Sequence, residues 1–185
     1  MKVTQLINEY SHSLVIANSV IANSSQKSYS KIDELSKEFD RKVRLLKNVE
    51  PEVLEGLLKV FRKLSLENYC KDAYDWLFVA YCHPSKIYIP VLCDLLNLEK
   101  VDCPNETIVE IMEELKCKEC FPVLKKTLNT KLSYDPDEQL ALKILDALVE
   151  IDELEAIQVL KECLNSPSYT IREEAELLLE DIQAG

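Results

Sequence analysis

The sequence has little glycine, few cations and no long apolar run. Only 2 of its 185 residues are glycine, too few for a sheet-rich fold with many tight turns or for a glycine loop around phosphates. Asp and Glu number 33 against 22 Lys and Arg, for a net charge of −11. We therefore expect no nucleic-acid partner, because phosphate binding requires clustered cations. No apolar run approaches the ~20 residues that cross a bilayer, so we also expect no membrane association.

Histidine is scarce as well, with His12 and His83 as the only two. Neither has a nucleophile or a carboxylate at helical spacing that makes a convincing catalytic dyad. Cys117 and Cys120 form the one CxxC motif, whereas a structural zinc site usually takes four ligands from two such pairs. We predict no metal site, no cofactor and no catalytic residues, and therefore a chain that is not an enzyme.

The cysteines indicate the cellular compartment. Seven irregularly spaced cysteines make an odd number for a secreted disulfide framework. Cys93 and Cys163 fall in apolar helical patterns, where a thiol packs as a small hydrophobe. Residues 13–22 look like the core of a signal peptide, but Glu9 and His12 precede them and polar residues interrupt them. We predict reduced thiols and a cytoplasmic protein.

Internal repetition is the strongest signal in the sequence. Residues 108–129 align without a gap to residues 144–165, with eight identities at an offset of 36, and a more diverged copy ends at residues 89–97. Steps of three and four between apolar residues place each stripe on one helix face. The first helices carry Ile108, Ile111, Met112 and Leu115, then Leu140, Ile144, Ala147, Leu148 and Ile151, then Ile171, Ala175, Leu178, Leu179 and Ile182. The last second helix carries Leu154, Ile157, Leu160 and Leu164.

Short breaks join the two helices of each unit, which is typical of antiparallel hairpins. We predict an all-α fold in a single domain over residues 1–185, with two-helix repeats over 51–185. Residues 1–50 are predicted to form irregular N-terminal helices that cap the stack. In that segment we expect helices over residues 3–22 and 30–48 and a loop at residues 23–28.

The start of the last unit resembles a known repeat family. Asn165-Ser166-Pro167, followed by Ile171-Arg172 and Ala175, is similar to HEAT-like repeats, and the similarity covers residues 84–182. It implies a HEAT-like α-solenoid of stacked antiparallel hairpins whose second helices line the concave side. It also implies a binding scaffold rather than a catalyst. The earlier units lack the arginine of the pattern.

Charge is distributed very unevenly along the chain. Residues 1–50 carry 8 basic and 6 acidic side chains, whereas residues 135–185 carry 3 and 14. A charge run usually marks a solvated face. Such asymmetry also suits a partner of opposite charge, so we predict one basic protein partner. We expect the chain to be a monomer on its own.

The predicted contact surface centres on the acidic turn at residues 150–155, between the two predicted helices of one repeat unit. It consists of Glu150, Asp152, Glu153, Glu155, Glu162, Tyr88, Lys118 and Glu119. Tyr88 belongs to a central aromatic cluster over residues 69–88, which either fills the core or supplies an exposed anchor.

The resemblance extends, in size and style, to helical immunity proteins of bacterial toxin systems, which neutralise toxins that are often basic nucleases. We predict such a non-catalytic protein-binding function. The alternative is an adaptor or assembly factor, similar to the bilin-lyase-like branch of these repeats, that acts on a chromophore or a host protein.

Overall fold

A computed structural model describes residues 2–21, 27–67, 69–100, 103–130, 135 and 137–184. These residues form ten α-helices, two short 3₁₀ helices and no strand, so the prediction of an all-α protein is confirmed. The α-helices are α1 (Val3–Ile21), α2 (Lys27–Arg44), α3 (Glu50–Glu67), α4 (Ala73–Cys82), α5 (Ile89–Asn97), α6 (Asn105–Glu114), α7 (Phe121–Leu128), α8 (Gln139–Ile151), α9 (Glu153–Cys163) and α10 (Tyr169–Ala184). The 3₁₀ helices η1 (Lys86–Tyr88) and η2 (Lys118–Cys120) directly precede α5 and α7.

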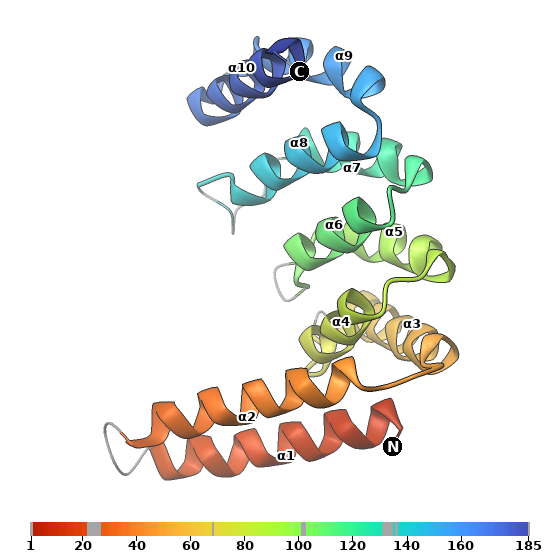
Figure 1. Ribbon diagram of the computed structural model, residues 1–185, viewed down its shortest axis with the longest axis vertical. Helices are drawn as coiled ribbons and strands as arrows, with labels where there is room; N and C mark the ends of the chain where they lie inside the picture. Colours follow the sequence, from red (N-terminus) through yellow and green to blue (C-terminus); the bar gives the residue numbers. More distant parts are fainter. Residues whose placement is uncertain are drawn as a thin grey trace.

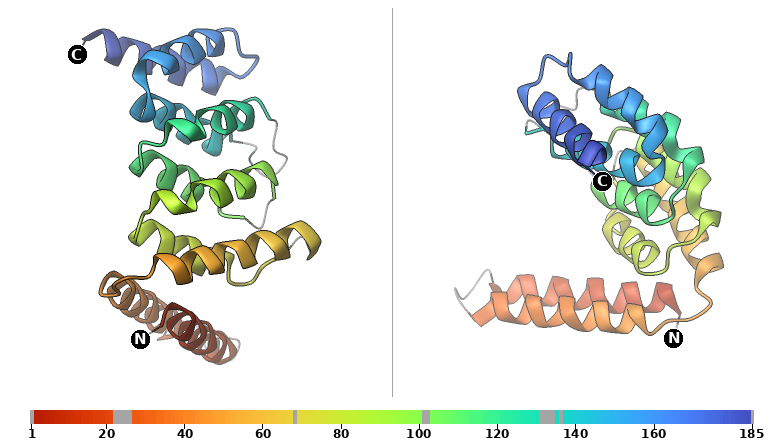
Figure 2. Two further views of the ribbon diagram at one scale, coloured as in Figure 1. Left: turned by 90° about the vertical axis from the view of Figure 1, so that its right-hand side faces the viewer. Right: turned by 45° about the horizontal axis from the view of Figure 1, so that its top comes forward.

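The helices are arranged in layers along the long axis of the molecule. At one end α1 and α2 lie side by side and antiparallel, and α10 lies at the other end (Figure 1). Between these ends the chain builds two rows. One row contains α4, α6, α8 and α10, and the other contains α3, α5, α7 and α9, which faces the viewer in the left view of Figure 2. Most neighbours within a row pack on one another, as α6 does on α4 and α8.

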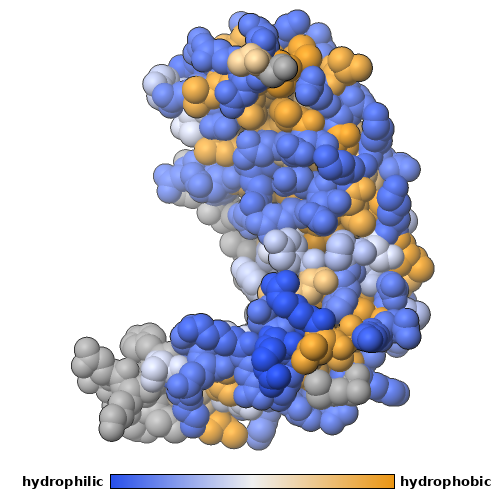
Figure 3. Space-filling model, viewed as in Figure 1, coloured by the Kyte–Doolittle hydropathy of each residue, from blue (hydrophilic) through white to orange (hydrophobic). Residues whose placement is uncertain are grey.

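The molecule is curved, with a hollow between the α1–α2 pair and the C-terminal layers (Figure 3). In Figure 1 this hollow lies on the side of the row α4, α6, α8 and α10. The prediction that the second helices of the repeat units line the concave side is therefore wrong, because α7 and α9 belong to the opposite row. The physical reason is the N-terminal pair: α2 packs against α4 and projects on the side of α4's row.

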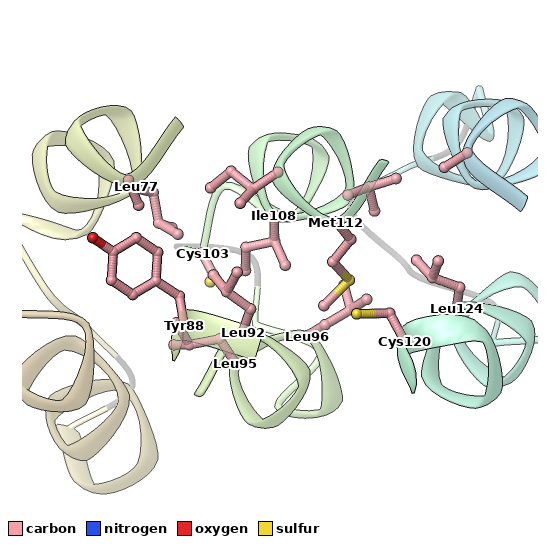
Figure 4. Close-up of a cluster of buried hydrophobic side chains, with 14 of the residues drawn as sticks. Leu77, Tyr88, Leu92, Leu95, Leu96, Cys103, Ile108, Met112, Cys120 and Leu124 are labelled. Carbon is pink, nitrogen blue, oxygen red and sulfur yellow. The ribbon is translucent and has the colours of Figure 1, made fainter. Parts of the chain in front are cut away.

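A continuous apolar core lies between the two rows. The predicted stripes of the first helices are buried over most of their length, including Ile108, Ile111 and Met112 of α6 and all five stripe residues of α8. Figure 4 shows Leu92 and Leu96 of α5 pointing toward Ile108 and Met112. Each such leucine contributes about 1.5–3 kcal/mol of stability when it is fully removed from water. Apolar contacts between the two rows therefore hold the layers together.

The predicted stripe of α9 is rotated from its expected face. Leu154 is 82% exposed and Leu164 is 40% exposed, whereas Ala156 and Val159 are buried beside Leu160. The prediction that Leu154 and Leu164 belong to the core is therefore wrong. Asp152 ends α8 and caps α9, so α9 begins in a direction that presents the face of Ala156 and Val159 to the neighbouring helices.

The N-terminal helices pack against the stack through apolar and polar contacts. Val3 is buried, and the backbone N–H groups of Val3 and Thr4 donate to the Glu52 carboxylate at 3.1 and 2.8 Å. Glu52 thereby satisfies helix-start donors that have no partner within α1. The second predicted helix begins at Lys27 rather than Ser30. Residues 23–26 of the predicted loop lie outside the described residues, and its last two residues, Lys27 and Ser28, belong to α2.

The CxxC motif spans the turn from α6 into α7. Cys117 and Cys120 form a disulfide with their Cα atoms 5.5 Å apart. The prediction that all seven cysteines are reduced is therefore wrong at this pair, which the short η2 turn places at bonding distance. Cys120 and Ala156 are both fully buried, which fits their equivalent places in the repeat alignment, where a small side chain is needed between helices.

Candidate protein-binding surface

The acidic turn between α8 and α9 has a local structural role. The Asp152 side chain accepts a hydrogen bond from the Glu155 backbone N–H at 3.3 Å and so caps α9. Glu153 and Glu155 lie in the first turn of α9, where negative charge interacts favourably with the helix dipole. Part of this acidic cluster is thus explained by helix formation alone.

Lysines of the preceding layer partly neutralise the predicted contact residues. The exposed ion pairs are Lys116–Glu150 at 3.2 Å, Lys118–Asp152 at 2.5 Å and Lys125–Glu162 at 2.9 Å. Exposed pairs of this kind contribute little to stability, although the hydrogen bond from Lys118 holds the pKa of the Asp152 carboxyl below its usual value.

The structure therefore brings most of the predicted surface together at one edge. Glu119 is exposed on η2, and Glu153 and Glu155 are exposed on α9. Among the described residues no cation forms an ion pair with Glu153 or Glu155. Leu154 lies between Glu153 and Glu155 in the sequence, and 82% of its surface is exposed. This edge combines an apolar side chain with uncompensated carboxylates.

Tyr88 does not belong to this surface. Its side chain is fully buried, and Figure 4 shows it within the core near Leu77. Burial raises the pKa of the phenol to about 12, and its hydroxyl has no hydrogen-bond partner among the described residues. The prediction that Tyr88 contacts a partner is wrong, because Tyr88 fills the core between layers.

A second acidic surface runs across the row of α6, α8 and α10. Its members, which we call the acidic row, are Glu110, Glu113, Asp146 and Glu174. Glu110 and Glu113 share one face of α6, Asp146 lies on α8 and Glu174 on α10. Lys143 pairs with Glu110 at 2.6 Å. Among the described residues the other three carboxylates of the row form no ion pair.

The electrostatics of the acidic row are unfavourable in the free protein. Partial burial raises the pKa of Glu113; Lys143 opposes that shift, but Glu150 and Asp146 add to it. The pKa of Glu174 is raised by partial burial and then by repulsion from Asp146. Like charges held on rigid helices and partly removed from water favour a cationic partner.

Sequence reasoning missed the acidic row because its members are spread over 65 residues of the chain. The repeat alignment does contain a signal, since the offset of 36 places Asp146 at the position equivalent to Glu110. A charge that recurs at one repeat position is expected to form a line across stacked layers.

No arrangement of three or more His, Cys, Asp or Glu side chains in the described part of the chain is suited to hold a metal ion. The described helices include none with both the length and the apolarity to span a membrane. A scan of family models gives no match to this chain, and neither the curated proteins nor the solved structures give one.

Proposed function

We propose that this chain is a non-catalytic protein-binding module, built as a HEAT-like repeat stack, that holds one basic protein partner. The observation that carries the proposal is the acidic row, which places four carboxylates on three neighbouring helices of one row, α6, α8 and α10. Lys143 is its one ion-paired cation among the described residues. Mutual repulsion and partial burial make this surface costly when it is free, and a basic partner offsets that cost.

The acidic edge at the α8–α9 turn extends the same field. Its ion pairs with lysines of the preceding layer are exposed and hence readily exchanged for pairs with a partner. Leu154 supplies exposed apolar contact area beside charged side chains, and protein interfaces combine apolar area with a polar rim. We therefore place the partner across the C-terminal layers, over α6 to α10.

The specific function we propose is that of an immunity protein that neutralises a basic, nuclease-type toxin domain. Support comes from the charge distribution, since residues 135–185 carry 14 acidic and 3 basic side chains. A nuclease must present cations to phosphates, so an acidic surface that covers those cations blocks its substrate. Electrostatic steering also speeds the encounter and disfavours wrong partners.

The test is affinity capture from the native organism with the tagged full chain, washed at low and at high salt. One stoichiometric basic protein, lost progressively as salt rises, is the expected result. The captured protein should lose its toxic activity when the chain is added. Several unrelated partners would instead favour the adaptor function, and an acidic partner held at high salt would contradict the proposal.

A further inference from the structure

A surface cavity of about 550 Å³ lies where the N-terminal pair meets the stack. It is lined from α1 and α2 on one side and from α4, with Thr107 of α6, on the other. Figure 1 shows the α1–α2 pair beside α4. The cavity is far from the acidic edge at the α8–α9 turn. None of the residues predicted from the sequence to bind a partner contributes to it.

Aromatic side chains form much of the cavity wall. Tyr10 and Phe39 stack with ring centroids 4.2 Å apart, and Phe78 of α4 lies 5.8 Å from Phe39. The Tyr10 hydroxyl and the Ser36 hydroxyl are hydrogen bonded at 3.0 Å, which fixes the Tyr10 ring. Tyr74 lines the cavity as well and is largely exposed. Rings held in this way attract cations to their faces.

The two cationic side chains that line the cavity already form ion pairs. Arg44 Nε donates to Asp40 at 2.7 Å, and Lys37 pairs with Asp33 at 2.7 Å. Asp75 is a half-buried carboxylate that accepts a hydrogen bond from the Ser11 hydroxyl at 3.3 Å. Among the described residues it has no ion-pair partner. The cavity thus contains a carboxylate that lacks a counterion next to a wall of aromatic rings.

We propose that this cavity binds an alkylammonium cation, with its N–H groups donating to Asp75 and its methylene chain against Phe39 and Phe78. A neutral apolar ligand would displace water from around Asp75 without compensating its charge, which is unfavourable. An anion would be repelled by the same carboxylate. The ammonium group comes either from a free polyamine or from a lysine side chain of another protein, because both present the same chemistry.

The test uses the full chain labelled with ¹⁵N and four probes followed by amide chemical shifts. The probes are n-butylammonium, its neutral counterpart n-butanol, spermidine and Nα-acetyl-lysine methylamide. We expect butylammonium, but not butanol, to shift amides around Tyr10, Phe39 and Asp75. Tighter binding of spermidine would identify a free polyamine as the source, and tighter binding of the lysine derivative would identify a protein side chain.

Two variants separate the Asp75 charge from the fold. Asp75→Asn keeps the shape and the bond from Ser11, and we expect it to weaken butylammonium binding about tenfold. Asp94→Asn removes a charge at an exposed position of α5 that does not line the cavity and should bind as the wild type does. Equal shifts with butanol, or unchanged affinity in a folded Asp75→Asn variant, would overturn the proposal. Neither result bears on the acidic row, so the two sites are tested independently.

Discussion

Replacing Asp75 by asparagine should stabilise the protein at neutral pH. Burial raises the pKa of Asp75 from 3.8 to about 6. At about 1.4 kcal/mol per pKa unit this difference corresponds to roughly 3 kcal/mol. Solvent at the cavity mouth screens the charge, so we expect a gain of about 1–2 kcal/mol. For a chain of this length that raises Tm by about 3–6 °C.

The pH dependence of this gain gives the sharper test. Because the pKa of Asp75 is higher in the folded state, the cost of its charge is absent below pH 3.8 and complete above pH 6. The advantage of Asp75→Asn over the wild type should therefore be full at pH 7.5 and fade as pH falls toward 4. Urea unfolding at both pH values measures it, with Asp94→Asn, at an exposed position of α5, as the control. An equal gain at pH 4 and 7.5, or a loss at pH 7.5, would refute the reasoning.

Two further predictions concern the core. Gly56→Ala should destabilise the protein by about 1–3 kcal/mol, because a Cβ there would lie 2.2 Å from the Trp76 ring. The control is Glu55→Ala, at the exposed neighbouring position. Equal unfolding midpoints for the two variants would contradict the tight contact between Gly56 and Trp76. Tyr88→Phe should raise stability by up to about 1 kcal/mol, because it removes a buried hydroxyl that has no partner among the described residues. Tyr81→Phe, at an exposed site, is the control and should leave the stability almost unchanged. A large fall in Tm for Tyr88→Phe alone, measured by thermal unfolding, would contradict this prediction and show that the Tyr88 hydroxyl is hydrogen bonded.

Periodicity predicted the helices of the C-terminal units well because each helix buries a stripe against its neighbours. The stripes of α6 and α8 are buried as expected, since apolar spacing determines which helix face packs inward. The stripe of α9 was assigned to the wrong helix face because Leu154 and Leu164, at its two ends, fit the apolar spacing but are exposed, whereas Ala156 and Val159 are buried. A terminal residue obeys the pattern without sharing the burial.

The cavity beside Asp75 could not be predicted from the sequence. Its walls come from Tyr10, Phe39 and Phe78, on three helices that periodicity identifies only as separate amphipathic elements. Their meeting depends on how the N-terminal pair packs on α4, and no local pattern encodes that packing. The same limit explains Tyr88, whose exposure depended on whether η1 faces the core or the solvent. By contrast, one pair of the acidic row, Glu110 and Asp146, was accessible in principle through the repeat offset.

The central claim is that the carboxylates of the acidic row, rather than net charge alone, hold a basic partner. Two full-length variants with equal net charge separate these possibilities. The row variant carries Glu110→Gln, Glu113→Gln, Asp146→Asn and Glu174→Gln. The control variant carries Glu9→Gln, Glu34→Gln, Glu55→Gln and Glu67→Gln, at exposed positions of α1 to α3.

The most direct measurement is the association rate of each variant with the captured basic partner between about 0.05 and about 0.3 M salt. We predict that the rate for the wild type and the control variant falls steeply with salt, and that the row variant associates more slowly with a flatter salt dependence. Equal rates and equal salt slopes for the row variant and the wild type would contradict the account.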